Sequence, residues 1–469
     1  MRTRWITSRG RFLAASLLVL AASAVTGSAA PAGSVPAPVA ASPGTPATQE
    51  GVAPGLLPVP DPLPAGDPGD LIAEARFDSG EFGFAVEAHQ VLYRSTDRAG
   101  RPIPVSGVVL VPVGVPAPAG GRNVVAWAHG TTGLIDGCAP SLDNQQGGRL
   151  NSPESYDRVD RILAAGHVVT ASDYPGLGTP GVHPYLDGVG EGRAVLDSIR
   201  LARRFGGTGA AVVEGFSQGS QAAIFAGQEW RAYAPDIDLR AVVAIGTPAR
   251  FGQAFAALDL PVVQSYIGKV LAGIVAGHPE LDRTQILTPS GEAAYDRFAA
   301  LDVPDGPCES PDFDPPRDLR ADPMAVPAWR AAFEADEPGR ALVPVPVLMV
   351  QSEADEQALA FLADGVCRDL VANGADVRMW RYDDESHVES VGVSADDRMA
   401  WILDRLADRP LTDSVAFTGE VPEVLTECPG DGEPAPAPPT TTEPGRVDVG
   451  EPLLPGPARP VRGTPDYAG

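Results

Sequence analysis

The chain has 469 residues, of which 44% are hydrophobic, so it can form one large domain or two ordinary ones around a sizeable core. Its formal charge is −26 at pH 7, and Lys269 is its single lysine. Nucleic-acid binding depends on basic side chains that neutralise phosphates. This charge therefore argues against a nucleic-acid partner, and against anionic partners in general.

The first 30 residues have the pattern of a secretory signal peptide. Four arginines between residues 2 and 11 precede the apolar stretch Phe12 to Val25, and small residues follow it. This stretch is shorter than the ~20 residues that a bilayer-spanning helix needs, although an uncleaved anchor is the alternative. Cleavage removes four arginines and no acids, which takes the charge from −26 to −30. We expect a secreted, extracellular protein without an integral membrane span in the mature chain; association with the cell envelope stays open.

Composition also marks the edges of the folded part. Residues 31–71 are rich in Pro, Ala, Gly and Ser and poor in large apolar groups, so they cannot bury enough surface to offset chain entropy. Residues 429–469, which contain "PAPAPPTTTEP", have the same character. We therefore expect a disordered leader and a disordered tail around one domain of residues 72–428, in which no internal repeat is evident.

The domain begins with two β-rich runs, "VEAHQVLYRS" and "VSGVVLVPV", which predict an antiparallel pair. Later apolar runs predict further strands: "NVVAWAHG", "HVVTASDY", "AAVVEGFS", "AVVAIGTP", "VPVLMVQS" and "VRMWRY". Helical patterns lie among them at residues 152–165, 190–205, 218–232, 356–373 and 395–408. Continuous apolar strands that alternate with helices predict an α/β fold with a mostly parallel, doubly wound sheet.

Residues 214–220, "EGFSQGS", contain the G-x-S-x-G pattern, which alone is weak in a chain with 52 glycines. Here the pattern follows a predicted buried strand and opens a predicted helix, which is the setting of a nucleophile elbow. In such an elbow the glycines allow close packing, and the serine hydroxyl stands clear at the end of the sheet. Ser217 is therefore the candidate nucleophile. The alternative is a serine that only caps the helix.

A serine hydroxyl needs a base to accept its proton, and on this fold the acid and the histidine follow the nucleophile in the chain. Of the six histidines, His387 in the loop "DDESHVES" is the one that lies after the last predicted strands. It is the candidate base. Asp355, shortly after the strand "VPVLMVQS", is the candidate acid. Glu353 and Glu356 are alternatives, because they lie within two residues of Asp355 and leave the exact position of the acid uncertain. Asp383 and Asp384 are further alternatives, because they are close to the histidine in sequence.

A hydrolase of this kind also needs backbone N–H groups that stabilise an oxyanion. Gln218, directly after the candidate nucleophile, supplies the first. The loop "HGTTG" follows an early predicted strand and offers the N–H groups of Gly130 and Thr131 for the second. The alternative for this loop is a glycine-rich turn without a catalytic role.

Secreted proteins meet an oxidising environment, so the four cysteines are expected to form two disulfides. Three pairings are possible among Cys138, Cys308, Cys367 and Cys428. Their spacing contains no C-x-x-C, so a structural zinc site is not expected. The acidic stretch "ESPDFDPPRD" lacks the pattern of a calcium-binding loop. No metal site is therefore predicted.

Several motifs in succession resemble the secretory lipase family of actinobacteria and yeasts, the lipase A-like α/β-hydrolases. They are "YRSTDRAGRPIPVSGVVLVP", "AWAHGTTG", "CAPS", "ASDYPGLGTPGVHPYL", "GEGRAVLDSIR" and "EGFSQGS", and the resemblance covers roughly residues 72–428. It implies an α/β-hydrolase fold with a helical cap, and hydrolysis of triacylglycerols and simpler carboxylic esters without a cofactor. Within "SDYPGLG", Asp173 is interpreted as structural rather than catalytic.

The resemblance also implies roles for single residues. It places the catalytic triad on Ser217, Asp355 and His387, and an oxyanion contribution near Gly130. It pairs two cysteines, Cys138 and Cys308, so as to fasten the cap, and it pairs Cys367 with Cys428 so as to close the C-terminal end near the histidine loop.

The cap is expected at about residues 250–342, between the strands "AVVAIGTP" and "VPVLMVQS". Within it, large apolar residues recur at helical spacing between Val263 and Val275, and the opposite face carries small residues. Such a helix is buried all round. We expect it to line an acyl-chain pocket; ordinary core packing is the alternative.

The sequence thus predicts a secreted serine hydrolase that cleaves carboxylic esters, a triacylglycerol lipase or esterase with a lipid or ester substrate. A secreted serine peptidase on the same fold is one alternative. A non-catalytic surface-binding protein with a decayed hydrolase fold is the other. The acyl-chain preference and the oligomeric state stay open.

Overall fold

The computed structural model describes residues 55–77, 84–142, 153–255, 261–300, 308, 312–411, 417–418, 420–425 and 427–429. Of residues 153–158, 253–254 and 261–265 it describes the backbone alone. The expected signal peptide, the first part of the expected leader and the expected tail from residue 430 lie outside the described residues.

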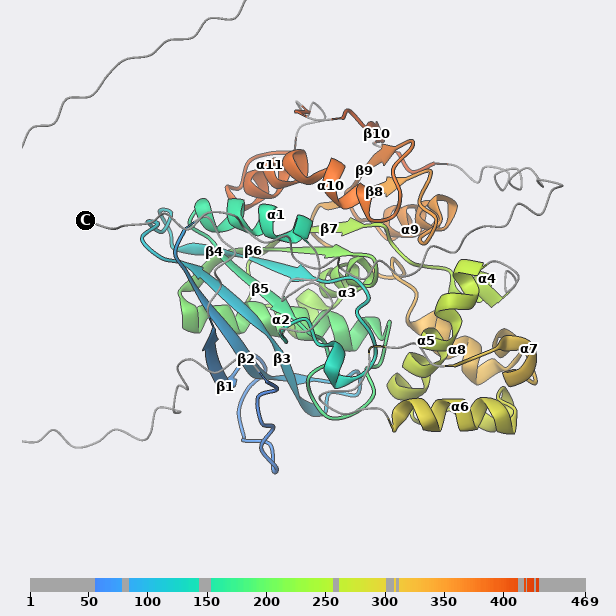
Figure 1. Cartoon of the computed structure of the whole chain (residues 1–469). Coiled ribbons are helices and arrows are strands. Elements are labelled where there is room, and N and C mark those ends of the chain that lie inside the picture. The colour runs from blue at the N-terminus through green and yellow to red at the C-terminus, as the bar shows by residue number, and fades with distance from the viewer. Residues whose placement is uncertain are drawn as a thin grey trace, which may run out of the picture. The chain divides into compact units, whose positions relative to one another are not determined.

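A single mixed sheet forms the centre of the domain (Figure 1). Its ten strands are β1 (Leu71–Phe77), β2 (Val86–Thr96), β3 (Pro102–Pro112), β4 (Arg122–Ala128), β5 (Val168–Ser172), β6 (Gly207–Phe216), β7 (Leu239–Ile245), β8 (Val347–Ser352), β9 (Val377–Tyr382) and β10 (Glu423–Leu425). They lie in the order β1-β2-β3-β5-β4-β6-β7-β8-β9-β10. The pairs from β5 to β9 are parallel, whereas β1, β2, β3 and β10 pair antiparallel to their neighbours. The predicted α/β fold is confirmed.

Helices cover both faces of this sheet (Figure 1). The longer ones around it are α1 (Pro153–Ala164), α2 (Gly188–Ala202), α3 (Gln218–Tyr233), α9 (Ala360–Ala372) and α11 (Ala395–Leu406), with a short α10 (Glu389–Val393). One buried apolar cluster joins α2, α3 and α9 to the sheet, and another joins α1 and α11 to its opposite face. The central strands therefore carry apolar side chains on both faces, as expected for a doubly wound sheet.

The sequence prediction and the structure differ at three elements. The edge strand β1, which begins at the last residue of the expected leader, was not predicted, and neither was β10, which has only three residues, too few to give a periodic pattern. The helix expected at residues 356–373 begins at Ala360. The chain before it forms a loop, because Asp355 Oδ1 accepts hydrogen bonds from the backbone N–H groups of Gln357 and Ala358, at 2.9 and 2.7 Å.

Residues 55–70, which the sequence assigned to the leader, lie against the domain. The N–H of Gly69 donates to the carbonyl of Arg94 in β2 at 2.7 Å. Leu56 packs against the buried apolar cluster of the cap. These residues therefore make defined contacts with the folded part of the chain.

The segment between β7 and β8, where the sequence places the cap, consists mainly of helices (Figure 1). Its helices are α4 (Phe251–Phe255), α5 (Pro261–Gly277), α6 (Pro289–Ala299), α7 (Pro315–Asp318) and α8 (Pro327–Ala335). Apolar side chains of α4, α5, α6 and α8 form one buried cluster with side chains of residues 134–142 and 177–186. No helix in the described part of the chain is both long and apolar enough to cross a bilayer.

Candidate active site

The candidate nucleophile lies at a sharp turn between β6 and α3. Ser217 has φ 54° and ψ −121°, a conformation that non-glycine residues rarely adopt and that costs about 1–3 kcal/mol. Its N–H donates to the carbonyl of Ile245 at 2.8 Å, and its carbonyl accepts from the N–H of Ser220 at 2.8 Å. The alternative of a plain helix cap is not supported, since the Ser217 hydroxyl makes no capping hydrogen bond. The geometry is that of a nucleophile elbow.

The two glycines of the motif are required by close packing of backbone on backbone. A Cβ on Gly215 would lie 1.9 Å from the carbonyl oxygen of Gly219. A Cβ on Gly219 would lie 2.0 Å from the carbonyl oxygen of Ala128 in β4. No side chain fits at either position, so the spacing in "EGFSQGS" follows from the turn itself.

The structure brings the predicted base and acid together. Nδ1 of His387 lies 2.8 Å from Oδ2 and 3.0 Å from Oδ1 of Asp355, and both side chains are buried. A carboxylate at Nδ1 fixes the imidazole with its Nδ1–H toward the acid and leaves Nε2 to act as a base. Asp355 is itself held in place, because Gln351 Nε2 donates to its Oδ2 at 3.2 Å.

The other candidate acids make different contacts. The exposed Glu353 forms an ion pair with Arg381, and Oε2 of Glu356 accepts from the backbone N–H of His387 at 3.0 Å. Asp383 and Asp384 are exposed on the loop before the histidine. Among the described residues, Asp355 is thus the carboxylate that bonds the imidazole.

The imidazole of His387 lies beside the end of β6 and β7. Its ring centroid is 4.7 Å from that of Phe216, the residue before Ser217. Its Cε1 would be 2.8 Å from a Cβ on Gly246, which directly follows Ile245, the acceptor of the Ser217 N–H. Within the described part of the chain, Nε2 is buried and has no hydrogen-bond partner, so it does not bond the Ser217 hydroxyl in this conformation. Such bonds are often long in ligand-free enzymes and shorten when substrate binds.

Gly246 gives a test of this geometry. Gly246→Ala is expected to lower kcat for ester hydrolysis about 10²-fold, because a Cβ would displace the imidazole and small misplacements of reacting groups have effects of this size. Its φ of +57° adds backbone strain of about 1–2 kcal/mol. Gly374→Ala is the matched control, since Gly374 has φ +90° and a Cβ there meets only Leu342, at 3.7 Å. Equal kcat values for the two variants would contradict the placement of His387.

The candidate oxyanion loop lies next to the elbow. A Cβ on Gly219 would be 2.7 Å from the carbonyl oxygen of His129, and one on Gly130 would be 3.0 Å from the ring of Phe216. Thr131 Oγ1 lies 2.8 Å from the hydroxyl of Tyr185, which holds the loop from the other side. Gln218, Gly130 and Thr131, predicted from separate motifs, therefore meet at the same end of the sheet.

Buried polar residues lie in this loop and in the neighbouring segment. The imidazole of His129 donates from Nδ1 to the carbonyl of Gly130 at 2.6 Å, and burial lowers its pKa to about 4, so it is neutral at pH 7. Asp173 accepts from Ser106 Oγ at 2.6 Å and from the N–H of Ser141 at 2.9 Å. Burial raises the pKa of Asp173 to about 6. Its hydrogen bonds agree with the structural role expected for it.

Two residues of the site escaped the sequence analysis as functional candidates. His183 and Glu191 are fully buried and bond the side chain of Gln218. Both lie in motifs that carried the family resemblance, "GVHPYL" and "GEGRAVLDSIR", but nothing in their spacing pointed to the residue after the nucleophile.

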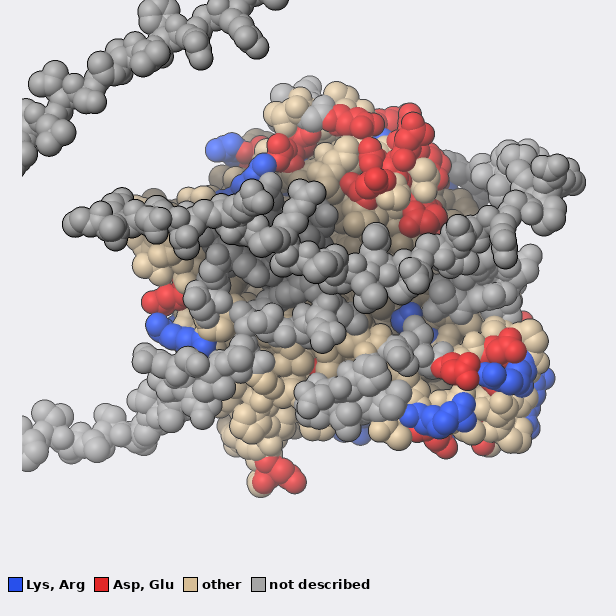
Figure 2. Space-filling model, in the orientation of Figure 1, with Lys and Arg blue, Asp and Glu red and all other residues tan. Residues whose placement is uncertain are grey.

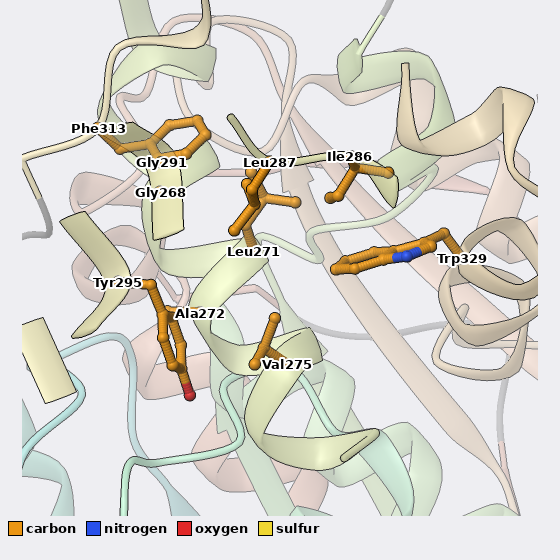
Figure 3. A pocket seen from close by; sticks show the side chains of 10 residues that line it. All are labelled: Gly268, Leu271, Ala272, Val275, Ile286, Leu287, Gly291, Tyr295, Phe313 and Trp329. Carbon is orange, nitrogen blue, oxygen red and sulfur yellow. The ribbon is translucent and has the colours of Figure 1, made fainter. Parts of the chain in front are cut away.

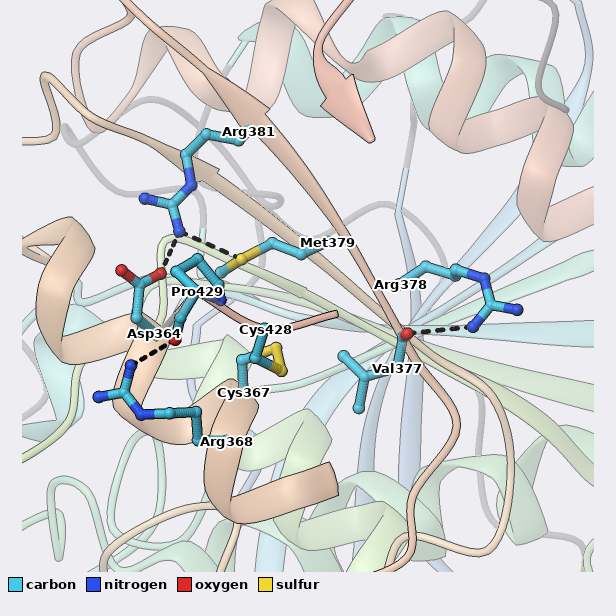
Figure 4. The surroundings of a disulfide bond; sticks show 9 residues. All are labelled: Asp364, Cys367, Arg368, Val377, Arg378, Met379, Arg381, Cys428 and Pro429. Atoms are coloured by element: carbon cyan, nitrogen blue, oxygen red, sulfur yellow. Dashed lines mark hydrogen bonds and ion pairs between the residues drawn. A yellow bond between two sulfur atoms is a disulfide. The ribbon is translucent and has the colours of Figure 1, made fainter. Parts of the chain in front are cut away.

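Both disulfides have the pairing that the resemblance implies. Cys138, next to the oxyanion loop, pairs with Cys308 of the cap segment. Cys367 of α9 pairs with Cys428, which follows β10 (Figure 4). Arg368 strengthens this second connection by donating to the carbonyl of Pro429 at 2.7 Å. Within the described residues no group of three or more His, Cys, Asp or Glu side chains could hold a metal ion.

The long cap helix α5 contacts the site with one face and lines an apolar cavity with another. Tyr266 donates its hydroxyl to Gln357 of the acid loop at 2.7 Å, and Gly273 packs against the backbone of Tyr185. The cavity is lined by Gly268, Leu271, Ala272, Val275, Ile286, Leu287, Gly291, Tyr295, Phe313 and Trp329 (Figure 3). At 100° per residue, the lining positions of α5 lie opposite the positions that touch the site. The cavity and the site loops therefore flank α5 on opposite sides.

Comparisons with known proteins agree with the motifs. Residues 156–302 match the family model described as Secretory lipase. A relative from Mycobacterium tuberculosis (strain CDC 1551 / Oshkosh), named "Probable inactive lipase MT1628", is 27% identical over 387 residues, which covers 76% of this chain and 84% of the relative. The closed state of Candida antarctica lipase A has a TM-score of 0.63 at 18% identity, over 74% of this chain and 84% of that chain. The rice cell wall degrading esterase LipA from Xanthomonas oryzae has a TM-score of 0.57 at 18% identity, over 73% and 99%.

The similar solved structures show the fold, which is that of an α/β-hydrolase. The family model shows which family the sequence of residues 156–302 resembles. The comparisons support a hydrolase of the lipase and esterase class, and one relative carries a name that denies activity. With these matches the resemblance found in the motifs is confirmed: residues 156–302 match the secretory lipase model, and the chain has the α/β-hydrolase fold.

Proposed function

We propose that the protein is a secreted, active carboxylic ester hydrolase, of the triacylglycerol lipase or esterase type, that works through a triad of Ser217, Asp355 and His387. The observation that carries this proposal is the buried pair of His387 Nδ1 and Asp355 Oδ2 at 2.8 Å, beside a serine in an elbow conformation. Two disulfides and the predicted signal peptide support secretion.

In the proposed reaction Ser217 Oγ attacks the ester carbonyl carbon while Nε2 of His387 takes the hydroxyl proton. Asp355 keeps the imidazole in the required tautomer and stabilises the imidazolium. The tetrahedral intermediate collapses when His387 returns the proton to the leaving alcohol. Water then attacks the acyl-enzyme by the same route and releases the carboxylic acid.

The oxyanion of each tetrahedral intermediate is proposed to accept hydrogen bonds from the backbone N–H of Gln218 and from the loop at Gly130 and Thr131. Donors of this kind act where negative charge develops, and losing one typically costs ~10²- to 10³-fold in kcat. Their support is the contact of this loop with both Phe216 and Gly219, on the two sides of the nucleophile.

The surface charge favours a neutral substrate. Acidic side chains gather over the region of α10 and β10 in Figure 2, and Asp383, Asp384 and Glu389 are exposed near His387 in the chain. Such a field repels anions and leaves neutral esters unaffected. Uncharged acyl esters and glycerides are therefore the proposed substrates, and a fatty-acid product would be driven away from the surface.

A direct substrate comparison tests this function. The purified chain is expected to hydrolyse p-nitrophenyl esters and triglycerides, and to leave peptide p-nitroanilides uncleaved under the same conditions. A series from short to long acyl chains then separates an esterase from a lipase. Preferential peptide cleavage would establish the serine peptidase instead. Absence of turnover for every ester, with the fold intact, would establish the non-catalytic alternative that the name of the mycobacterial relative raises.

A further inference from the structure

The side chain of Gln218 is locked in a buried polar network. Gln218 is the first residue of α3 and has 0% exposure. Its Nε2 lies 2.7 Å from Nε2 of His183 and donates to Oε1 of Glu191 at 2.9 Å. Both amide hydrogens are thereby used, which leaves the side chain one orientation.

The partners of Gln218 are fixed in turn. His183 Nδ1 is 2.7 Å from the carbonyl of Pro175, so Nδ1 carries the proton and Nε2 accepts from the amide. Oε1 of Glu191 also accepts from the backbone N–H of Leu186 at 2.9 Å. Burial raises the pKa of Glu191, and the hydrogen bonds that its carboxylate accepts from the Gln218 amide and the Leu186 N–H oppose that shift.

This network bears on the peptide unit that joins Ser217 to Gln218. One end of that unit, the Ser217 carbonyl, accepts from the N–H and the hydroxyl of Ser220, at 2.8 and 2.7 Å. The other end is the Gln218 N–H, the proposed oxyanion donor. Since Ser217 is strained, the unit would relax by rotating unless its surroundings hold it. Ser220 holds the Ser217 carbonyl at one end of the peptide unit. The hydrogen bonds of the Gln218 side chain hold the residue at the other end.

From this geometry we infer that His183 and Glu191 are positioning residues for the oxyanion hole. They act through the Gln218 side chain, which keeps the strained peptide unit turned so that its N–H faces the oxyanion. This inference rests on the proposed ester hydrolysis. It adds a buried histidine and glutamate that neither touch the substrate nor belong to the triad.

The same segment reaches the second arm of the oxyanion hole. Tyr185, two residues after His183, lies 2.8 Å from Thr131 Oγ1 through its hydroxyl. Leu186, directly after Tyr185, has a strained backbone with φ 64°. Its N–H donates a hydrogen bond to Oε1 of Glu191, which stabilises this turn. One short turn, residues 183–187, therefore contacts both sides of the site.

The test compares two glutamines on one helix. Gln218→Met removes the amide at nearly constant volume and is expected to lower kcat for p-nitrophenyl ester hydrolysis about tenfold, with KM within twofold. Gln221→Met is the matched control: Gln221, one turn later, is equally buried, and its Nε2 makes two hydrogen bonds, to the carbonyls of Leu186 and Asp336 at 3.1 and 2.6 Å. It should lower the thermal midpoint by a similar amount and leave kcat within twofold. Equal kcat losses in both variants would show a merely structural role.

Glu191 provides a second, independent route. Glu191→Leu is expected to lower kcat about tenfold, whereas Glu191→Gln keeps the accepting oxygen and should restore the wild-type value within twofold. Combining Glu191→Leu with Gln218→Met should lower kcat no further than either change alone, because both break the same link. Multiplied losses, or a wild-type kcat in Glu191→Leu, overturn the inference. If Ser217→Ala is inactive while these variants are fully active, the inference fails and the proposed function stands.

Discussion

Ser217→Ala is expected to lower kcat for ester hydrolysis by about 10⁶-fold, the loss that typically follows removal of the nucleophile from a serine triad. The variant should stay folded, since the Ser217 hydroxyl makes no capping hydrogen bond and the backbone bonds of the elbow remain. Burst and steady-state kinetics with p-nitrophenyl esters measure the loss. The thermal midpoint serves as the control for folding, and it should change by no more than a few degrees.

A retained rate in Ser217→Ala would place the chemistry elsewhere in the molecule. A fall of only about tenfold would assign Ser217 a supporting role, with attack by water in place of an acyl-enzyme. Either result contradicts the covalent mechanism.

Asp355→Asn is expected to lower kcat by about 10⁴-fold, the effect known for the same exchange in a serine protease triad. The asparagine amide would donate toward Nδ1 of His387 and stabilise the wrong tautomer, in which Nε2 carries the proton and cannot act as a base. The pH profile of kcat, measured from pH 5 to 10 in wild type and variant, checks this reason, because loss of the base removes the wild-type dependence.

Glu356→Gln is the matched control for the acid. Glu356 is the next residue in the chain, is exposed, and accepts from the backbone N–H of His387 at 3.0 Å, so it touches the same loop without touching the imidazole. Its exchange should change kcat by less than about fivefold. A larger loss in Glu356→Gln than in Asp355→Asn would reverse the assignment of the acid.

The residues of the proposed triad could be named from the sequence because, on the α/β-hydrolase fold, the catalytic residues follow particular strands in a fixed chain order. Ser217 follows an apolar strand and opens a helix, and the acid and the base follow the next strands in a fixed order. With six histidines in the chain, elimination left His387. For the acid, the sequence favoured Asp355 but left Glu353 and Glu356, within the same four residues, as alternatives. The choice depends on which carboxylate points toward His387, and loop geometry decides that.

Other features of the site were invisible in the sequence because they depend on long-range contacts. Gly246 is one of 52 glycines in the chain. A Cβ does not fit there because of the imidazole of His387, which lies 141 positions later in the sequence. The role inferred for His183 and Glu191 depends on their hydrogen bonds to Gln218, which no periodicity in the sequence encodes. For α5, the pattern gave an apolar helix but not which face lines the cavity and which face touches the site loops.

The central claim is that Ser217 Oγ is an activated nucleophile. The most direct measurement is covalent labelling of the folded chain with a fluorophosphonate probe, followed by mass spectrometry of the digested protein. The account predicts one label per chain, on the peptide that contains Ser217, and none in Ser217→Ala. No label on the folded wild-type chain, or a label on another residue, would contradict it.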